Sequence, residues 1–259
     1  MTKTKKKKEY IQLVDDSELV IDSTIKTFLK SSDTFVDIID DNIIKFYSNH
    51  KLILSELYPI LDSIGFEIEK QVAFDIESIF VAKFTLINID SKLMKKNSKH
   101  IKSVIAKALN GEMPTKCKLL GLAYRVDFSL REIKLFRALA EYQDQLNPEY
   151  NFTRIINRLI TNYLEFTKHS LDYFKAKFDP KIKDREPKIE YVRAKLLSSL
   201  RDIENINDDK MAKMLLLILD NIVRTNYYLK KETISFKIET KNIKHLLKGT
   251  QPNIEAFVF

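Results

Sequence analysis

Hydrophobic and polar residues change period several times along the 259-residue chain. In its first half, several short runs alternate between apolar and polar residues, which is typical of half-buried strands. We predict three such strands, at 43–47, 66–76 and 79–89. The last two would pair as a hairpin, with Glu77 and Ser78 in its turn.

Helical periodicity separates these strands. Ser55 starts a run with apolar residues on one face, and Gly65 stands where a helix commonly ends. Asp90 is a favourable N-terminal cap for a second helix, which Gly111 would close. The order strand, helix, strand, strand, helix predicts most of a ferredoxin-like unit over residues 42–112, in which two helices cover one face of a small antiparallel sheet.

The remaining chain is read mainly as helix. Residues 1–41 have no clean period, and we expect a basic tail followed by one or two short helices. Ser129 and Glu132 fit a capping box for a helix that would run to Leu146. Three more amphipathic stripes follow, at 151–178, 189–203 and 211–228. Amphipathic helices bury their apolar faces against one another, so residues 113–230 are predicted to form a bundle.

Strand-like alternation returns near the end of the chain. Ile234, Phe236 and Ile238 alternate with polar residues, and a second alternating run occupies 254–259. Because an isolated two-stranded hairpin is only marginally stable in water, we predict that residues 231–259 begin a larger sheet whose other strands lie outside this chain. The predicted fold class is α+β and mainly helical: a ferredoxin-like βαββα unit, a helical bundle and two terminal β-strands.

Charge and cysteine usage narrow the classes of function. The net charge of +8 includes a run of five lysines, Lys3 and Lys5 to Lys8, and the other charges are nearly balanced. Nucleic-acid binding by the folded part is therefore not expected, and a free-standing basic helical module for nucleic-acid binding or assembly is kept as the alternative. Cys117 is the single cysteine, and no apolar stretch approaches the about 20 residues of a membrane helix, so we expect a cytoplasmic protein without a membrane span.

The sequence has few candidates for chemistry. Its four glycines are isolated, and none begins a phosphate-binding GxGxxG or GxxxxGK[ST] pattern. Its four histidines are far apart, without the spacing of a metal site. We predict no catalytic, cofactor-binding or metal-binding residue in this chain. Arg137, Arg224 and Asn226 lie beside apolar helical faces, where buried charges need partners; we expect structural or interface ion pairs, with solvent exposure or ligand contact as alternatives.

Several blocks of sequence follow the order of those in a known family. They are NIIKFYSNHKLILSELYPILDSIGFEIEKQVAFDI (42–76), FSLREIKLFRALAEYQDQL (128–146), KAKFDPKI (175–182), VRTNYY (223–228), SFKI (235–238) and IEAFVF (254–259). The second is similar to a family helix SWREVxLLRAYxxYLRQ, the third to EARFDP and the last to FEIFVYS. Together the blocks resemble the large NAD-specific glutamate dehydrogenases of bacteria.

The resemblance implies that residues 42–112 are an ACT-like module and that residues 231–259 begin a truncated catalytic-domain sheet. The parent reaction would convert L-glutamate, NAD and water to 2-oxoglutarate, ammonium and NADH. No catalytic or cofactor residue of the family can be assigned to a position here, so the chain is expected to be an inactive regulatory or scaffold segment. Its expected partners are the catalytic domain, further copies of itself and an amino-acid effector.

Overall fold

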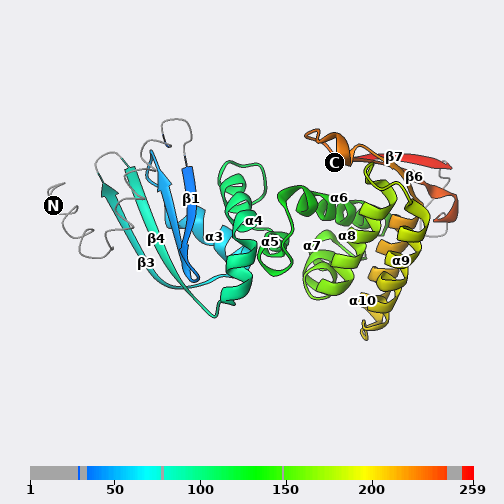
Figure 1. Cartoon of the computed structure of the whole chain (residues 1–259), viewed down its shortest axis with the longest axis horizontal. Helices are drawn as coiled ribbons and strands as arrows, with labels where there is room; N and C mark the ends of the chain where they lie inside the picture. Colours follow the sequence, from blue (N-terminus) through cyan, green and yellow to red (C-terminus); the bar gives the residue numbers. More distant parts are fainter. Residues whose placement is uncertain (1–28, 30–33, 77–78, 148, 244–252) are drawn as a thin grey trace. The chain divides into compact units, whose positions relative to one another are not determined.

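A computed structural model describes residues 29, 34–76, 79–147, 149–243 and 253–259. The chain divides into two compact units. We call residues 1–130 the α/β unit and residues 131–259 the helical unit. Each has its own sheet and its own helices, which Figure 1 labels.

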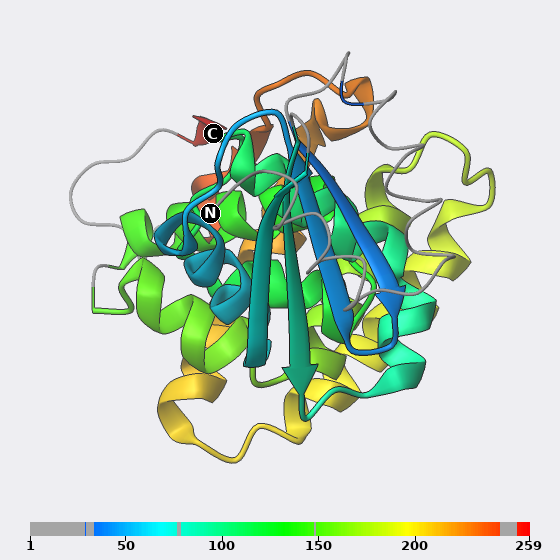
Figure 2. The same ribbon diagram turned by 90° about the vertical axis from the view of Figure 1, so that its left-hand side faces the viewer.

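A four-stranded antiparallel sheet of order β1-β2-β4-β3 forms the framework of the α/β unit. Its strands are β1 (Thr34–Asp40), β2 (Ile43–Ser48), β3 (Glu67–Ile76) and β4 (Ile79–Ile87). Its two long helices, α3 (Leu54–Ile64) and α4 (Ser91–Leu109), cover one face of the sheet, as Figures 1 and 2 show. The predicted order strand, helix, strand, strand, helix is confirmed as β2, α3, β3, β4 and α4; the predicted hairpin turn at Glu77 and Ser78 lies outside the described residues.

Residues 34–40 were predicted to belong to a tail with short helices, and this was wrong. They form β1, which pairs with β2 so that Val36 lies opposite Phe46 and Ile38 opposite Ile44. Apolar residues in β1 occur in adjacent pairs, because both of its faces are partly buried, and this hides the alternation. β1 occupies the sheet edge beside β2, where a complete ferredoxin-like unit would place its last strand.

Two of the predicted helix boundaries in the α/β unit, the end of α3 and the start of α4, are confirmed by their caps. Gly65 ends α3 with φ of 95°, a left-handed conformation that favours glycine, and its amide donates to Leu61 and Asp62 carbonyls. At the start of α4, the Asp90 carboxylate accepts from the amides of Lys92 and Leu93 at 2.9 and 3.1 Å. Local signals therefore mark the end of α3 and the start of α4.

Residues 113–130 were predicted to begin the bundle, but they belong to the α/β unit. They include a 3-10 turn, η1 (Lys118–Leu120), and a short helix, α5 (Gly121–Arg125). Gly121 comes so close to α3 that an added Cβ would lie 3.0 Å from the Ile64 carbonyl oxygen. The buried Ser63 hydroxyl donates to the Thr115 carbonyl at 2.9 Å and accepts from the Cys117 amide at 3.1 Å.

The helical unit contains most of the predicted bundle. Its helices are α6 (Leu130–Leu146), α7 (Phe152–Arg154), α8 (Leu164–Phe178), α9 (Arg185–Arg201) and α10 (Ile206–Asn221). The stretch predicted as one helix from 151 to 178 is divided by a π-helical segment, η2 (Ile155–Ile160). The Thr161 amide and hydroxyl both bond to the Ile156 carbonyl, and this satisfies the widened turn before α8 begins.

A three-stranded antiparallel sheet of order β5-β6-β7 lies beside these helices (Figure 1). Its strands are β5 (Ile222–Thr225), β6 (Ser235–Glu239) and β7 (Ile254–Val258). The prediction of two terminal strands was incomplete, because residues 222–225 were expected to continue a helix. A run of β-branched residues suits a strand better than a helix, and pairing with β6 decides the outcome.

One face of this sheet is buried against the helices. Phe236 of β6 and Phe257 of β7 stack with their rings at 11°, and Phe174 of α8 meets Phe236 edge to face. From α6, the Tyr142 hydroxyl donates to Glu255 at 3.2 Å. Burial is the main cause that raises the pKa of this phenol, with Glu255 adding to it.

Replacing Ser63 with alanine should destabilise the α/β unit by about 1–3 kcal/mol, because the Thr115 carbonyl and the Cys117 amide would lose their buried partner. Urea unfolding followed by circular dichroism would measure the loss. Ser55→Ala, at an exposed position of the same helix, is the matched control. Equal unfolding midpoints for the two variants would contradict the assigned role.

Candidate functional site

The junction between α10 and the sheet is held by a cluster of polar side chains. The Asp220 carboxylate accepts from the Tyr173 hydroxyl of α8 at 2.6 Å and from Arg193 of α9 at 3.0 Å. Lys177 of α8 donates to the Leu219 and Asp220 carbonyls at 2.5 and 2.8 Å. The cluster therefore joins three helices at the point where helix changes to strand.

Burial and hydrogen bonding shift several pKa values in this cluster. Burial lowers the pKa of Lys177 to about 8, although Asp220 acts in the opposite direction. Burial and the hydrogen bond to Asp220 raise the pKa of the Tyr173 phenol. The amine lies over the rings of Tyr173 and Phe178 at 5.6 and 5.3 Å from their centroids, so it is surrounded by aromatic surface as well as by carbonyl oxygens.

A second contact fixes the turn between β5 and β6. The Arg131 guanidinium, at the start of α6, donates to the Tyr227 carbonyl from Nε and Nη2 at 3.3 and 2.8 Å. Its Nη1 donates to the Lys231 carbonyl at 2.5 Å, and the group lies 5.1 Å from the Tyr227 ring centroid. One side chain therefore bonds to two carbonyl groups of the turn that leads into β6.

The structure places the three residues predicted from sequence at separate positions. Asn226 is in the same turn, where its amide group donates to the Thr233 carbonyl and accepts from the Ser235 amide at 2.8 Å. Arg224 lies exposed on β5 opposite Lys237, and it has no ion-pair partner in the described part of the chain. Their roles at an interface stay predictions.

Arg137 is half-buried in a mainly aromatic setting. Its Nη2 is 3.7 Å from the Glu141 carboxylate one turn along α6, which is a long ion pair. Its guanidinium is 5.8 and 5.5 Å from the ring centroids of Phe152 and Phe259. Arg137 therefore links α6 to α7 and to the residue after β7 through cation–π contacts.

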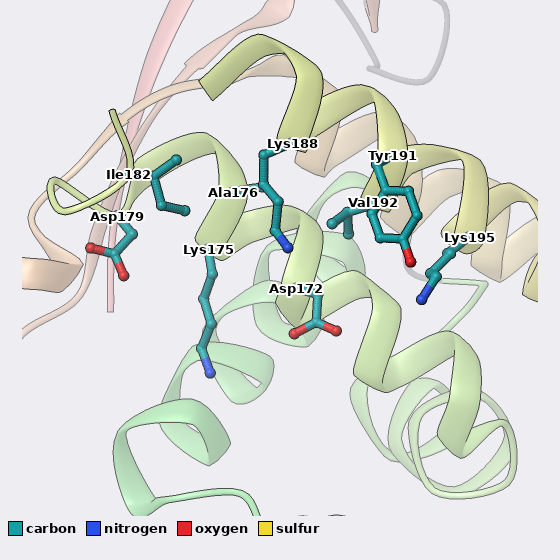
Figure 3. Close-up of a pocket in the computed structure, with 9 residues that line it drawn as sticks. All are labelled: Asp172, Lys175, Ala176, Asp179, Ile182, Lys188, Tyr191, Val192 and Lys195. Carbon is teal, nitrogen blue, oxygen red and sulfur yellow. The ribbon is translucent and has the colours of Figure 1, made fainter. Parts of the chain in front are cut away.

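An open cavity of about 320 Å³ lies between α8 and α9 (Figure 3). Its base includes the buried side chains of Ala176 and Val192. Charged side chains from both helices and a tyrosine from α9 surround the cavity. Its polar lining residues are Asp172, Lys175, Asp179, Lys188, Tyr191 and Lys195. The mixed charges and apolar base make this cavity the candidate binding site of the helical unit.

Electrostatic contacts organise the rim of the cavity. Lys195 lies 4.6 Å from the Tyr191 ring centroid, and its hydrogen bond to the phenol lowers the Tyr191 pKa and raises its own. Lys188 approaches the same ring at 5.7 Å. Lys175 is bound to Glu132 of α6 at 2.5 Å, so its charge is already compensated.

The described residues contain neither a metal-binding cluster nor a membrane-spanning helix. No group of three or more histidine, cysteine, aspartate or glutamate side chains there is arranged to hold a metal ion. No helix in that part of the chain is long and apolar enough to cross a membrane.

Comparison with known proteins shows what the chain is similar to. Residues 119–180 match the family described as glutamate dehydrogenase, helical motif 3. Residues 195–259 match the family described as bacterial NAD-glutamate dehydrogenase, catalytic domain. The chain is also similar to the NAD-specific glutamate dehydrogenase of Halomonas elongata, with 22% identity over 230 residues. The resemblance to NAD-specific glutamate dehydrogenases that the sequence blocks indicated is therefore confirmed.

The matches cover most of this chain but only a small part of the relative. The similarity covers 84% of this chain and 14% of the Halomonas protein, so the chain spans about a seventh of the length of that relative. The catalytic-domain match begins at residue 195, inside α9, whereas the predicted boundary lay between 230 and 231. α10 and the whole three-stranded sheet fall within it.

Stability should depend on pH through Lys177. Its pKa falls from 10.5 to about 8 on folding, so above pH 8 the unfolded state binds the proton that the folded state has lost, and stability rises with pH. Tyr173 and Tyr227 have pKa values raised above their ordinary 10.0, so they act in the opposite direction, and stability should fall above about pH 10. Urea unfolding measured at a series of pH values across this range should show a maximum in the free energy of unfolding.

Lys177→Met should remove the rising part of this profile, whereas Lys210→Met, at an exposed position of α10, should retain it. A rise of the same slope in both variants would assign the effect to another group.

Arg131→Lys should destabilise the helical unit by about 1–3 kcal/mol, although it keeps the charge, because an ammonium cannot reproduce the fork that reaches two carbonyls. Hydrogen exchange of the β6 amides would report the loosened turn. Lys134→Met, three residues along the same helix, is the control. Unchanged protection in Arg131→Lys would show that the contact does not hold the sheet.

Proposed function

We propose that this chain is a non-catalytic scaffold and regulatory segment of an NAD-dependent glutamate dehydrogenase. The observation that carries the proposal is the joining of two matched family segments within one compact unit. Residues 131–180 of the helical-motif match and residues 195–259 of the catalytic-domain match both lie in the helical unit. The contacts of Tyr173 and Lys177 in the first with Asp220 in the second connect them directly.

The three-stranded sheet is proposed to continue into a larger catalytic-domain sheet. Among the described strands, β7 has a neighbour on one side only. On its outward face, Ile254 and Val258 are 50% and 64% exposed. Unpaired strand edges with exposed apolar residues readily add a further strand. A strand added beside β7 would pair this edge, and an overlying catalytic-domain element would cover the outward face.

The α/β unit is proposed to be the regulatory part. Its antiparallel order β1-β2-β4-β3, with both long helices on one face, supports an ACT-like module in which β1 takes the place of the missing last strand. Modules of this kind often bind amino acids at strand or subunit edges. Assembly into homo-oligomers belongs to the same proposal.

The reaction itself is proposed to require other parts of the enzyme. In the parent enzyme L-glutamate would be oxidised to 2-oxoglutarate and ammonium as NAD accepts the hydride. The four isolated glycines of this chain provide no loop of the kind that approaches a dinucleotide phosphate. The purified chain should therefore show no glutamate-dependent NADH formation, and turnover by it alone would overturn this division of labour.

The exposed edge of β7 can be tested by co-purification. The chain should associate with a separately expressed catalytic region of a glutamate dehydrogenase from the same organism. Ile254→Lys and Val258→Lys should each weaken that association about tenfold or more, since each places a charge in the new contact. Ile206→Lys changes an isoleucine on α10 that is 72% exposed, and it should leave the association unchanged. Equal effects of all three substitutions would contradict the proposed contact.

A further inference from the structure

The outward face of the three-stranded sheet carries a pair of like charges next to an apolar stripe. In β6, Phe236 and Ile238 are buried and Lys237 between them is exposed, so Lys237 points away from the helices. Lys237 lies opposite Arg224 of β5 on one side and opposite Ala256 of β7 on the other. Residues directly opposite each other share a sheet face, so Arg224, Lys237 and Ala256 form one row across the outward face.

The two cations of this row lack an ionic partner among the residues that the structure describes. Arg224 and Lys237 are both exposed, and neither makes a salt bridge there. The Glu239 carboxylate stands on the same face two residues along β6, but within the described residues it makes no salt bridge with either of them. Like charges directly opposite each other destabilise an antiparallel pair, whereas a carboxylate placed between them would be attracted by both. The pair therefore suits an acidic partner.

An apolar stripe runs along β7 beside these cations. Ile254 and Val258 are 50% and 64% exposed, and the small side chain of Ala256 is exposed between them. Covering the stripe is favourable in proportion to the apolar area that is removed from water. A phosphate or another small anion would bind the cations and leave the stripe in water. The face therefore suits a protein element that carries apolar residues next to a carboxylate.

We infer that the outward face of the β5-β6-β7 sheet docks an amphipathic helix of the catalytic region, with an aspartate or glutamate of that helix between Arg224 and Lys237. Helices commonly cover a sheet face in this way, with their apolar stripe toward the sheet. The apolar residues of the helix cover the β7 stripe, and its carboxylate accepts hydrogen bonds from the fork-shaped Arg224 guanidinium. The inference rests on the proposed function, since it assigns the chemistry of the element that covers this face.

Carbodiimide cross-linking would test the contact directly, because this reagent joins an amine to a carboxylate only where the two groups touch. The full chain is mixed with the separately expressed catalytic region of a glutamate dehydrogenase from the same organism. Peptide mass spectrometry should then show Lys237 joined to an aspartate or glutamate of that region. Lys210, on the exposed surface of α10, should not be joined to it.

Charge variants measure the contribution of the pair. Arg224→Met and Lys237→Met should each weaken the association about tenfold, since each removes one of the two charges that face the carboxylate. Lys237→Arg keeps the charge and should retain most of the affinity, and Lys210→Met should associate as the wild-type chain does. Lys237→Glu should weaken the association further, and a lysine at the cross-linked partner position should restore part of it. Circular dichroism confirms that each variant is folded.

Three results would overturn the inference: an association that Arg224→Met and Lys237→Met leave unchanged, no cross-link from Lys237 to the catalytic region, or a cross-link from Lys237 to a second copy of this chain instead. If the wild-type chain and the catalytic region do not associate at all, the inference and the proposed contact of β7 both fail. If they associate and only the β7 substitutions weaken the association, the proposed function stands and this inference alone fails.

Discussion

The helical unit depends on the abrupt end of α10. The last carbonyl groups of a helix have no partners within it and must find them elsewhere. At the end of α10, Lys177 provides a single amine for the Leu219 and Asp220 carbonyls, and Asp220 itself is held by Tyr173 and Arg193. Because these contacts end the helix in place, the chain can enter β5 at the next residues and pair with β6. One polar cluster therefore holds α8, α9 and α10 together at the point where the sheet begins.

The features predicted from sequence were those set by local chemistry. Gly65 and Asp90 mark helix ends because a left-handed turn and a capping carboxylate act within a few residues. β1 was missed because both its faces are partly buried, and β5 because its four residues follow a helical stripe without a break. In both cases pairing with a neighbouring strand overrides the local pattern, and a single sequence does not show which strands become neighbours.

In the candidate site too, sequence shows what lies on one element and does not show what different elements bring together. The spacing of Lys188, Tyr191 and Lys195 by three and four residues puts them on one helix face, which the sequence can show. Asp172 comes from a different helix, so the mixed charge of the cavity is visible only in three dimensions. Likewise Arg131 and Tyr227 are 96 residues apart, and nothing near Arg131 distinguishes it from a surface arginine. Sequence reasoning instead selected Arg137 and Arg224, because apolar neighbours were the only signal available.

The cavity and the polar cluster both join the same pair of family segments. Asp172 and Ala176 fall within the helical-motif match and Lys195 within the catalytic-domain match, while Lys188 and Val192 lie in the short stretch between them. A molecule bound there would contact both segments at once. The next polar contact along α9 is Arg193, which reaches Asp220 at the end of α10. α9 therefore lines the cavity with Val192 and holds the end of α10 with the neighbouring Arg193, so the packing of α8 against α9 shapes both features.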